Sequence, residues 1–390
     1  MVEEKAVPVH ASPPVSKQPS PLPALLAALP PVVFLLLFRL VCHNRAVVNT
    51  VVWHVTTPVK HAIAHLCAHL PCNVAELVWT AGVLGALALA AGSLHAVLRS
   101  TMLRLRGGAE RPLRTLLCRW LVILAAALWV YAGYTAMWGV NYYADTFSQR
   151  SGLEGRKITT EELAALTRTF ALCCNELSGS VPRNGDGVYQ GELPLLFSKA
   201  AGQYEALYEE FPCLDMDETP ARPMFYSKIM SAIGFTGFYF PFTGESLVNV
   251  DAPYCLVPAT ILHELAHQRN VALEDEANFL AIAAGLHSDD GEFRYSAALM
   301  GYIHLSNALY AAKPGLWSET DALLNDQVRC DLQDNNAFWR SHDSPASDAA
   351  EGVYSSFARS YEQEDIMKSY GACVDLLAAY YLPKERETDG

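Results

Sequence analysis

Three long uncharged runs of apolar residues dominate the first part of the chain. They cover residues 22–38, 77–98 and 120–140, with 17, 22 and 21 residues respectively. A helix needs about 20 such residues to cross the hydrocarbon core of a bilayer. The first run is short and contains Pro30 and Pro31, but no small-residue cleavage signal follows it closely. The pattern predicts three transmembrane helices that form a membrane anchor over residues 22–140, after a disordered tail over residues 1–21.

Beyond residue 140 the hydrophobic periodicity is mostly helical. A threonine pair followed by two glutamates is typical of a helix start, and it opens the first helical pattern, at 159–177. A second pattern predicts one continuous helix over 193–211. Helical patterns resume at about Pro258 and continue to Leu382, with loops at 286–292 and 340–350.

Residues 235–250 interrupt this helical pattern. They are rich in aromatic and β-branched residues and contain Gly and Pro, which favours one or two short strands. The expected fold is therefore mainly α. An N-terminal three-helix transmembrane anchor is followed, at 141–390, by a mostly helical domain with a small β element.

Charge is distributed unevenly between these two parts. Residues 1–140 carry 11 Lys and Arg against 4 Asp and Glu, a balance of +7, whereas residues 141–390 carry 17 against 37, a balance of −20. Six arginines between the second and third apolar runs indicate a loop that stays in the cytoplasm. The third span then leaves the cytoplasm, so we expect a multi-pass protein of the cell membrane with an extracytoplasmic C-terminal domain. The six are Arg99, Arg104, Arg106, Arg111, Arg114 and Arg119.

Composition excludes two classes of function. With 51% hydrophobic and 18% charged residues and a net charge of −13, the chain is too apolar and too acidic to bind nucleic acid. None of the predicted spans holds a paired charge, which a transport pathway through the membrane would need. The expected partners are the lipid bilayer and, for the acidic domain, a substrate that is not a polyanion.

The candidate chemistry lies in the motif His263-Glu264-Leu265-Ala266-His267. Two histidines at i and i+4 project from one face of a helix, and both can bind one zinc ion. The glutamate at i+1 is turned toward the side where a zinc-activated water lies, so it is placed to act as a general base. The spacing predicts His263 and His267 as zinc ligands and Glu264 as the catalytic residue.

A catalytic zinc site needs a third protein ligand and one open position. Asn270 can adopt the left-handed conformation that ends a helix, and the acidic cluster Glu274-Asp275-Glu276 follows this turn. One acid of this cluster is the expected third ligand, and the spacing leaves open which one. The other interpretation is that the cluster only stabilises the N-terminus of the next helix.

Several segments together resemble a bacterial family of uncharacterised membrane-anchored proteins, which is classed by resemblance with zinc metallopeptidases. The similarity covers the three predicted spans and nearly the whole outer domain. The resemblance implies a zincin-like, mostly helical domain. The segments that carry it are His-Glu-Leu-Ala-His-Gln-Arg at 263–269, Glu-Asp-Glu-Ala-Asn-Phe-Leu-Ala at 274–281, Arg-Tyr-Ser at 294–296, Tyr-Phe-Pro-Phe-Thr-Gly-Glu at 239–245 and Ser-Tyr-Gly at 369–371.

The segment Glu-x-x-Ala-Asn at 274–278 is also similar to a signature of other zincins, in which the first glutamate binds zinc. This resemblance implies Glu274 as the third ligand and a supporting role for Asn278. Two features depart from the pattern. The step from the second histidine to Glu274 is only seven residues, and Asn270 stands where the resembling family commonly has glycine. Glu276 and Asp275 therefore remain alternative ligands.

The aromatic segment at 235–250 precedes the motif helix, as the substrate-binding edge strand does in zincins. Main-chain pairing with such a strand holds an extended peptide. An ordinary hydrophobic strand is the alternative interpretation. Tyr295, Tyr302 and Tyr370 are candidates for stabilising the oxyanion of a hydrolytic reaction.

These observations predict a membrane-anchored, zinc-dependent metallopeptidase that acts on peptide or protein substrates outside the cell. The alternative function is a non-catalytic, zinc-binding membrane receptor or sensor with a zincin-like fold. Glu264 favours the enzyme, because a pure binding site does not need a general base beside its histidines.

The arginine-rich loop makes the topology testable. A reporter that is active only outside the cytoplasm should be active when fused after Gly390 and silent when fused at Gly108. A second reporter that matures only in the cytoplasm is the control and should show the opposite pattern. Activity of the first reporter at Gly108 and silence at Gly390 would place the C-terminal domain in the cytoplasm.

Overall fold

The computed structural model describes residues 19–108, 111–359, 361 and 370–382. Helices account for 72% and strands for 3% of the structure, which confirms a mainly helical protein. The chain divides into two compact units. Unit 1 comprises residues 1–36 and 81–132, and unit 2 comprises residues 37–80 and 133–390. Most of the predicted disordered tail, residues 1–18, lies outside the described residues.

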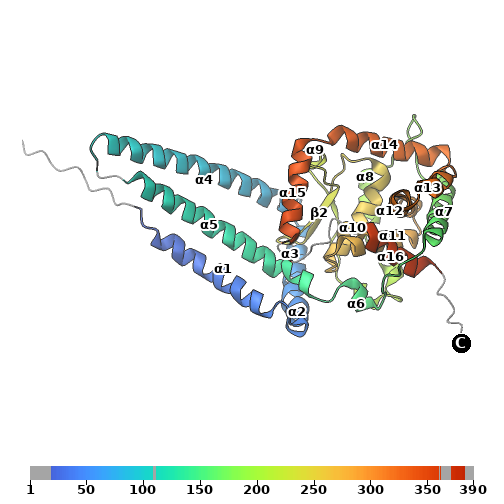
Figure 1. The fold of residues 1–390 in the computed structure, drawn as a ribbon, viewed down its shortest axis with the longest axis horizontal. Helices are drawn as coiled ribbons and strands as arrows, with labels where there is room; N and C mark the ends of the chain where they lie inside the picture. Colours follow the sequence, from blue (N-terminus) through green and yellow to red (C-terminus); the bar gives the residue numbers. More distant parts are fainter. Residues whose placement is uncertain (1–18, 109–110, 360, 362–369, 383–390) are drawn as a thin grey trace, which may run out of the picture. The chain divides into compact units, whose positions relative to one another are not determined.

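Unit 1 contains most of three long helices. All three are long and apolar enough to cross a membrane. Leu87 and Leu94 are each 62% exposed, and lipid is the solvent that such side chains favour. Within the unit, the Trp129 indole donates a hydrogen bond to the Ala27 carbonyl over 2.9 Å. The three helices are α1 (Leu22–Val41), α4 (Val74–Leu105) and α5 (Pro112–Met137) (Figure 1).

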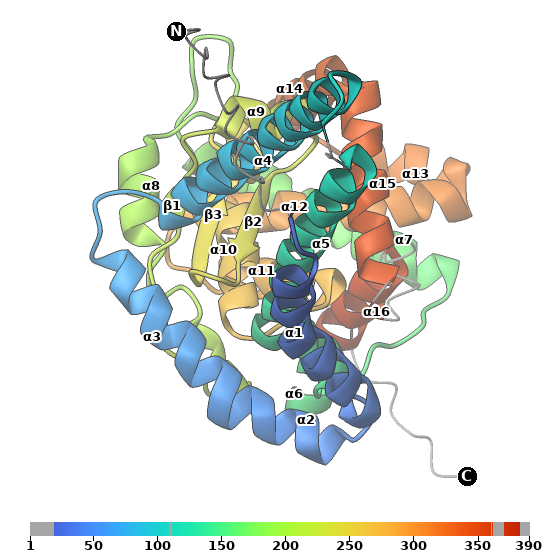
Figure 2. The same cartoon turned by 90° about the vertical axis from the view of Figure 1, so that its left-hand side faces the viewer.

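The first part of unit 2 comes from the chain between and just after these long helices. Residues 45–68 form an almost unbroken helical arm, which Figure 2 shows beside the sheet of the unit. The third apolar run, residues 120–140, is α-helical only as far as Met137, so the helix ends slightly before the apolar pattern does. The elements are α2 (Arg45–Val51), a π-helical turn (Val52–Thr56), α3 (Thr57–Ala68), a 3-10 turn (Gly139–Tyr143) and α6 (Phe147–Ser151).

The first predicted helix of the domain is confirmed as α7 (Thr160–Leu177). Thr159 accepts a hydrogen bond from the Glu162 amide, and the Glu162 side chain accepts one from the Thr159 amide. This reciprocal capping satisfies two donors that the helix itself leaves unpaired.

The predicted continuous helix over 193–211 is wrong. The structure has a short helix, α8 (Leu193–Lys199), then turns and a 3-10 segment at Glu205–Leu207. Gly202 has a φ of +77°, which an L-residue in a helix does not adopt, and it breaks the helix there. The apolar side chains of the pattern are nevertheless buried, because the irregular turns still direct Leu196, Tyr204 and Leu207 inward.

The segment 235–250 contains two short strands, where the sequence predicted one or two. β2 (Gly237–Phe240) pairs antiparallel with β3 (Glu245–Val248), and β1 (Arg222–Pro223) pairs parallel with the other edge of β3. The strand order β1-β3-β2 places β2 at an edge of this sheet. Helix α9 (Ser227–Ala232) connects β1 to β2. The sheet packs against α10, the helix that carries the candidate motif.

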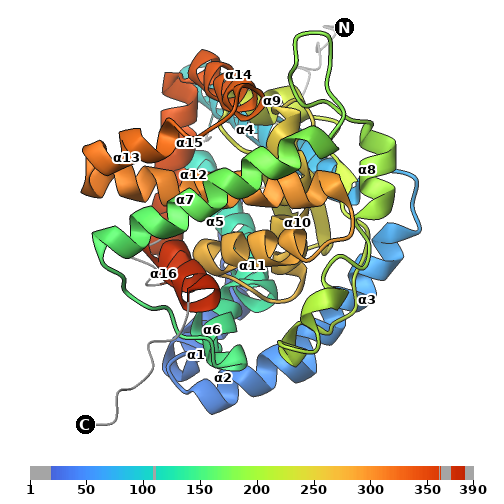
Figure 3. The same ribbon diagram turned by 90° about the vertical axis from the view of Figure 1, so that its right-hand side faces the viewer.

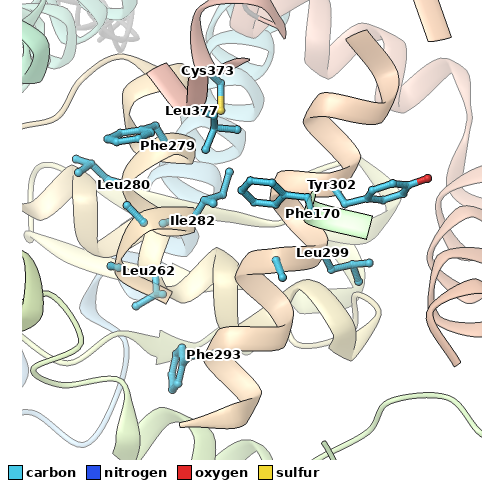
Figure 4. Packing of buried hydrophobic residues seen from close by; sticks show 14 of the residues in the cluster. Phe170, Leu262, Phe279, Leu280, Ile282, Phe293, Leu299, Tyr302, Cys373 and Leu377 are labelled. Atoms are coloured by element: carbon cyan, nitrogen blue, oxygen red, sulfur yellow. The ribbon is translucent and has the colours of Figure 1, made fainter. Parts of the chain in front are cut away.

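The core of unit 2 lies among α7, α10, α11, α12 and α16 (Figure 3). Figure 4 shows Leu262, Phe279, Phe293 and Leu377 in this core, one from each of four helices. Gly301 of α12 lets that helix approach α7, because a Cβ there would collide with the Phe170 ring. The remaining bounds are α10 (Val257–Gln268), α11 (Glu274–Leu286), α12 (Gly291–Ala312), α13 (Pro314–Asp321), α14 (Asp326–His342), α15 (Pro345–Arg359) and α16 (Tyr370–Tyr381), with 3-10 turns at Ser178–Ser180, Pro212–Leu214 and Tyr254–Leu256.

The close approach of α12 to α7 is testable by adding one methyl group. Gly301→Ala should lower the free energy of unfolding by about 1–3 kcal/mol, because the packed ring of Phe170 has to move. Gly315→Ala is the matched control. It also replaces a helical glycine, but nothing lies within 4 Å of its Cβ position, so stability should stay constant or rise slightly. Thermal unfolding of the full chain measures both, and equal stability of the two variants would contradict the packing.

Candidate active site

Helix α10 positions the three residues of the motif. Pro258 lies in its first turn, where a missing amide hydrogen has no cost, and Ile261, Leu262 and Leu265 anchor it in the core. Glu264 is 3% exposed and His267 6% exposed, so both are removed from bulk water. The motif therefore lies in a buried part of unit 2 with its side chains on a defined helix face.

Two further residues at the end of α10 hold the helix in place. The Arg269 side chain is fully buried, forms an ion pair with Glu218 over 2.7 Å, and stacks 4.0 Å from the Tyr204 ring centre. The Gln268 amide group bonds both the amide and the carbonyl of Thr219. These contacts fix the position of the adjacent His267.

The turn after α10 brings the acidic cluster back to the histidines. Asn270 has a φ of 58°, which confirms the predicted left-handed residue. The next helix, α11, begins at Glu274. Because only a short turn separates α10 from α11, the first residue of α11 lies beside the last turn of α10.

His263, His267 and Glu274 converge on one point. Their Nε2, Nε2 and Oε2 atoms are separated by 3.1 Å between the histidines, 3.1 Å from His263 to Glu274 and 3.8 Å from His267 to Glu274. Tetrahedral zinc with ligand bonds of about 2.0–2.1 Å separates its ligand atoms by about 3.3 Å. The donor set and its spacing therefore fit a zinc ion.

The other ring nitrogen of each histidine has its own hydrogen-bond partner. His267 Nδ1 lies 2.7 Å from the Val271 carbonyl, which can only accept, so this nitrogen carries the hydrogen. His263 Nδ1 lies 2.9 Å from Asn278 Oδ1. Both contacts leave the Nε2 lone pairs directed at the shared point, which is the arrangement found around protein-bound metals. Asn278 thus has the position of the supporting residue that the resemblance implies.

The electrostatics of the cluster attract positive charge. Burial lowers the pKa of His267 to about 4, against an opposing effect of Glu274. Burial also acts to lower the pKa of His263, but the hydrogen bond and charge of Glu274 outweigh it and raise this pKa to about 9. Positive charge on His263 is therefore stabilised by the Glu274 carboxylate.

Glu276 occupies a different environment from Glu274. Its two carboxylate oxygens accept hydrogen bonds from the amides of Phe147 and Ser148, over 2.8 and 2.9 Å, at the start of α6. The converging group of ligand atoms contains Glu274 and neither Glu276 nor Asp275. Sequence spacing could not separate these acids, because the partner of Glu276 comes from a segment more than 100 residues away.

Glu264 lies against the edge strand β2. A Cβ at Gly237 would be 2.5 Å from Glu264 Oε1, so only glycine leaves room for the carboxylate at this point of the strand. Among the described residues, Glu264 Oε2 is buried without a hydrogen-bond partner. Burial raises the pKa of Glu264 to about 8, which makes its carboxylate a stronger base. Glu264 therefore faces the strand that the sequence predicts as a support for a substrate.

Residues that the sequence analysis missed form another wall of the site. The Trp138 ring meets the His267 ring edge to face, with centres 5.6 Å apart, and its indole donates to the Tyr142 hydroxyl. Burial raises the pKa of Tyr142, and the charge of Glu274 adds to the effect. In the sequence, only their position at the end of an apolar run distinguishes these two residues. That position is equally typical of residues that contact lipid headgroups, so it did not indicate a place in the site.

Lys60 of α3 was also missed. Its side chain is fully buried, and Nζ donates to Asn270 Oδ1 over 2.6 Å and lies 4.9 Å from the Trp138 ring centre. Burial lowers the pKa of Lys60 to about 7. The Asn270 amide donates in turn to Thr57 Oγ1 over 2.8 Å. The helix between the first two apolar runs is therefore part of the wall.

The candidate oxyanion tyrosines are not in this cluster where the structure describes them. The Tyr295 hydroxyl bonds Asp331, and the Tyr302 hydroxyl bonds Asp321. The side chain of Tyr370 lies outside the described part of the chain.

Comparison with known families identifies the family of the chain. A family model described as "Protein of unknown function (DUF3810)" matches residues 54–378, which include the second and third long helices and the whole candidate site. The chain belongs to this family. No curated protein and no solved structure matches it.

The different environments of the two glutamates of α11 give a paired prediction. Glu274→Ala should abolish stoichiometric zinc binding, because it removes one of three converging ligands. Glu276→Ala should keep zinc bound and lower the free energy of unfolding by about 1–3 kcal/mol, because two buried amides at the start of α6 lose their acceptor. Zinc content per folded chain and thermal unfolding measure the two effects. Loss of zinc in Glu276→Ala with retention in Glu274→Ala would reverse the assignment.

Proposed function

We propose that the chain is a membrane-anchored, zinc-dependent peptidase in which His263, His267 and Glu274 hold the metal. The observation that carries this proposal is the convergence of three ligand atoms beside a buried carboxylate, Glu264. A zinc ion in such a site lowers the pKa of a water molecule and polarises the carbonyl of a substrate. A site that only binds zinc can be completed by a fourth ligand and does not need a buried base.

Glu264 supplies the proton transfer in this proposal. Its carboxylate takes a proton from the attacking water and delivers it to the nitrogen of the broken peptide bond. The products are a new carboxylate and a new amine, so no oxidant, reductant or further co-reactant is needed. The raised pKa of Glu264 suits both steps, because the group has to accept and release a proton near neutral pH.

Strand β2 is the proposed support for the substrate. It is an edge strand, and its Gly237 touches Glu264, so a peptide paired with its backbone lies next to the base. Main-chain hydrogen bonds to an edge strand hold an extended chain without regard to most of its side chains. This favours peptide or unfolded protein segments as the substrate class.

In the alternative function, a receptor, Glu264 has no role as a base. A sensor needs the metal and a bound peptide but no proton transfer. Burying an unpaired carboxylate without a chemical role costs free energy, and evolution of a binding site would favour a neutral side chain there. The location outside the cytoplasm that the arginine-rich loop indicates is part of the proposal for either function.

Replacing the base separates the two functions. Glu264→Gln keeps the size of the side chain, so zinc should still bind at full occupancy while peptide hydrolysis falls by about 10²–10⁴-fold. Glu162→Gln is the matched control, because its glutamine can still cap α7 and lies outside the site. Turnover of a randomised peptide library by the full chain, at equal zinc occupancy, is the measurement. Equal turnover in Glu264→Gln, or none in the unaltered protein, would favour the receptor.

A further inference from the structure

The candidate site is joined directly to the end of the third apolar helix. Helix α5 ends at Met137, and the next residue, Trp138, has its ring against His267. One residue advances a chain by at most about 3.8 Å. The ligand His267 is therefore separated from the end of α5 by little more than one indole ring.

The start of the second apolar helix is joined to the same site from the other side. The Glu245 carboxylate accepts hydrogen bonds from the amides of Val74 and Ala75, over 3.0 and 2.7 Å, and so caps α4. The next residue of β3, Ser246, donates a hydrogen bond to the Glu264 carbonyl over 2.8 Å. Two consecutive residues of β3 thus connect the first turn of α4 to the catalytic segment of α10.

An exposed apolar surface lies beside the first turns of α4. The Glu76 carboxylate accepts hydrogen bonds from the amides of Phe225 and Tyr226, over 3.0 and 2.8 Å, one residue before the uncharged run begins at Leu77. Phe225 is 84% exposed, and Ile229 in the following helix is 58% exposed. Where α4 enters a bilayer, a phenyl ring at this level is in position to contact the interface, which favours aromatic side chains.

We propose that the site acts at the membrane surface, on polypeptides tethered to the same bilayer, and cuts them within a short distance of their anchor. The proposal rests on the peptidase function proposed above and names its substrate class. Residues 74–80 and 133–138 belong to the same compact unit as the site, so the two proposed membrane entry points and the proposed ligands lie within one unit. Phe225 and Ile229 contact the bilayer that carries the substrate.

The proposed geometry selects substrates by height above the membrane. A tethered polypeptide already has a high effective concentration near the bilayer, and that concentration falls as its linker lengthens. A site held beside two membrane entry points reaches only the first residues outside the bilayer. A free peptide lacks both advantages and should be a poor substrate.

The test uses the full zinc-loaded chain in lipid vesicles with one randomised segment presented in three ways. The segment follows a transmembrane anchor after about 5 residues, or after a flexible linker of about 40 residues with a mean reach of about 35 Å, or is free in solution. We expect the near segment to be cut at least about tenfold faster than the distant one, and the free segment to be cut slowest. Glu264→Gln should suppress all cutting.

The outcomes separate this inference from the function on which it rests. Equal rates for near, distant and free segments would overturn the membrane-surface inference and leave the peptidase intact. No cutting of any segment by the zinc-loaded protein would overturn both. Cutting of the distant segment alone would also contradict the proposal.

A surface variant tests the contact with lipid. Replacing Phe225 and Ile229 together by serine should lower the rate on the near segment severalfold and leave the rate on the free segment unchanged. The free segment reports whether the variant is folded and active. Leu172→Ser, which alters a 51% exposed side chain of α7, is the matched control and should leave the near-to-free ratio constant. An unchanged ratio in the Phe225 and Ile229 variant would remove these two residues from the proposal.

Discussion

The close packing of two imidazoles and a carboxylate at the end of α10, of which His267 is buried and the others partly buried, is the constraint on which the rest of unit 2 depends. Charged groups that leave water lose several kcal/mol of solvation each, and contact with opposite charge or fixed dipoles has to offset this loss. His263, His267 and Glu274 offset it through one another, over 3.1–3.8 Å, and through Asn278 and the Val271 carbonyl. Such short contacts require α10 and α11 to keep a fixed relative position. The packed side chains on the far faces of both helices, among them Leu262 and Phe279, provide this rigidity.

The turn at Asn270 shows how one residue serves both the backbone and the packing. A left-handed turn needs glycine or asparagine, because most other side chains clash with the backbone there. Glycine would make the same turn, but it would leave Lys60 and Thr57 without their partner. This contact explains why asparagine stands where the resembling family commonly has glycine. Its side chain binds α3, so the segment between the first two apolar runs becomes part of the site.

The parts of the structure that could be predicted from the sequence depend on short spacings. The capping residues of α7, the i, i+4 histidines and the left-handed Asn270 are encoded within a few neighbouring positions. The prediction of one helix over 193–211 was wrong. The apolar spacing correctly indicated which side chains are buried, but the positive φ of Gly202 excludes a continuous helical backbone. The contacts of Lys60 and Trp138 with the site could not be predicted, since each joins segments more than 100 residues apart. The same holds for Glu276, whose capping role depends on residues 147–148.

The connection between the apolar helices and the site has a mechanical consequence. An enzyme tethered by a flexible linker of about 20 residues samples heights of about 25 Å above its membrane. In this chain Trp138 directly follows Met137, the last residue of α5. The first turn of α4 is capped by Glu245, a residue of the sheet that packs against α10. Trp138 contacts His267, so a change in the last turn of α5 directly alters the surroundings of a proposed zinc ligand. In the proposed function, packing within unit 2 sets the height of the site above the bilayer, and this packing therefore also determines which segments of a substrate come within reach.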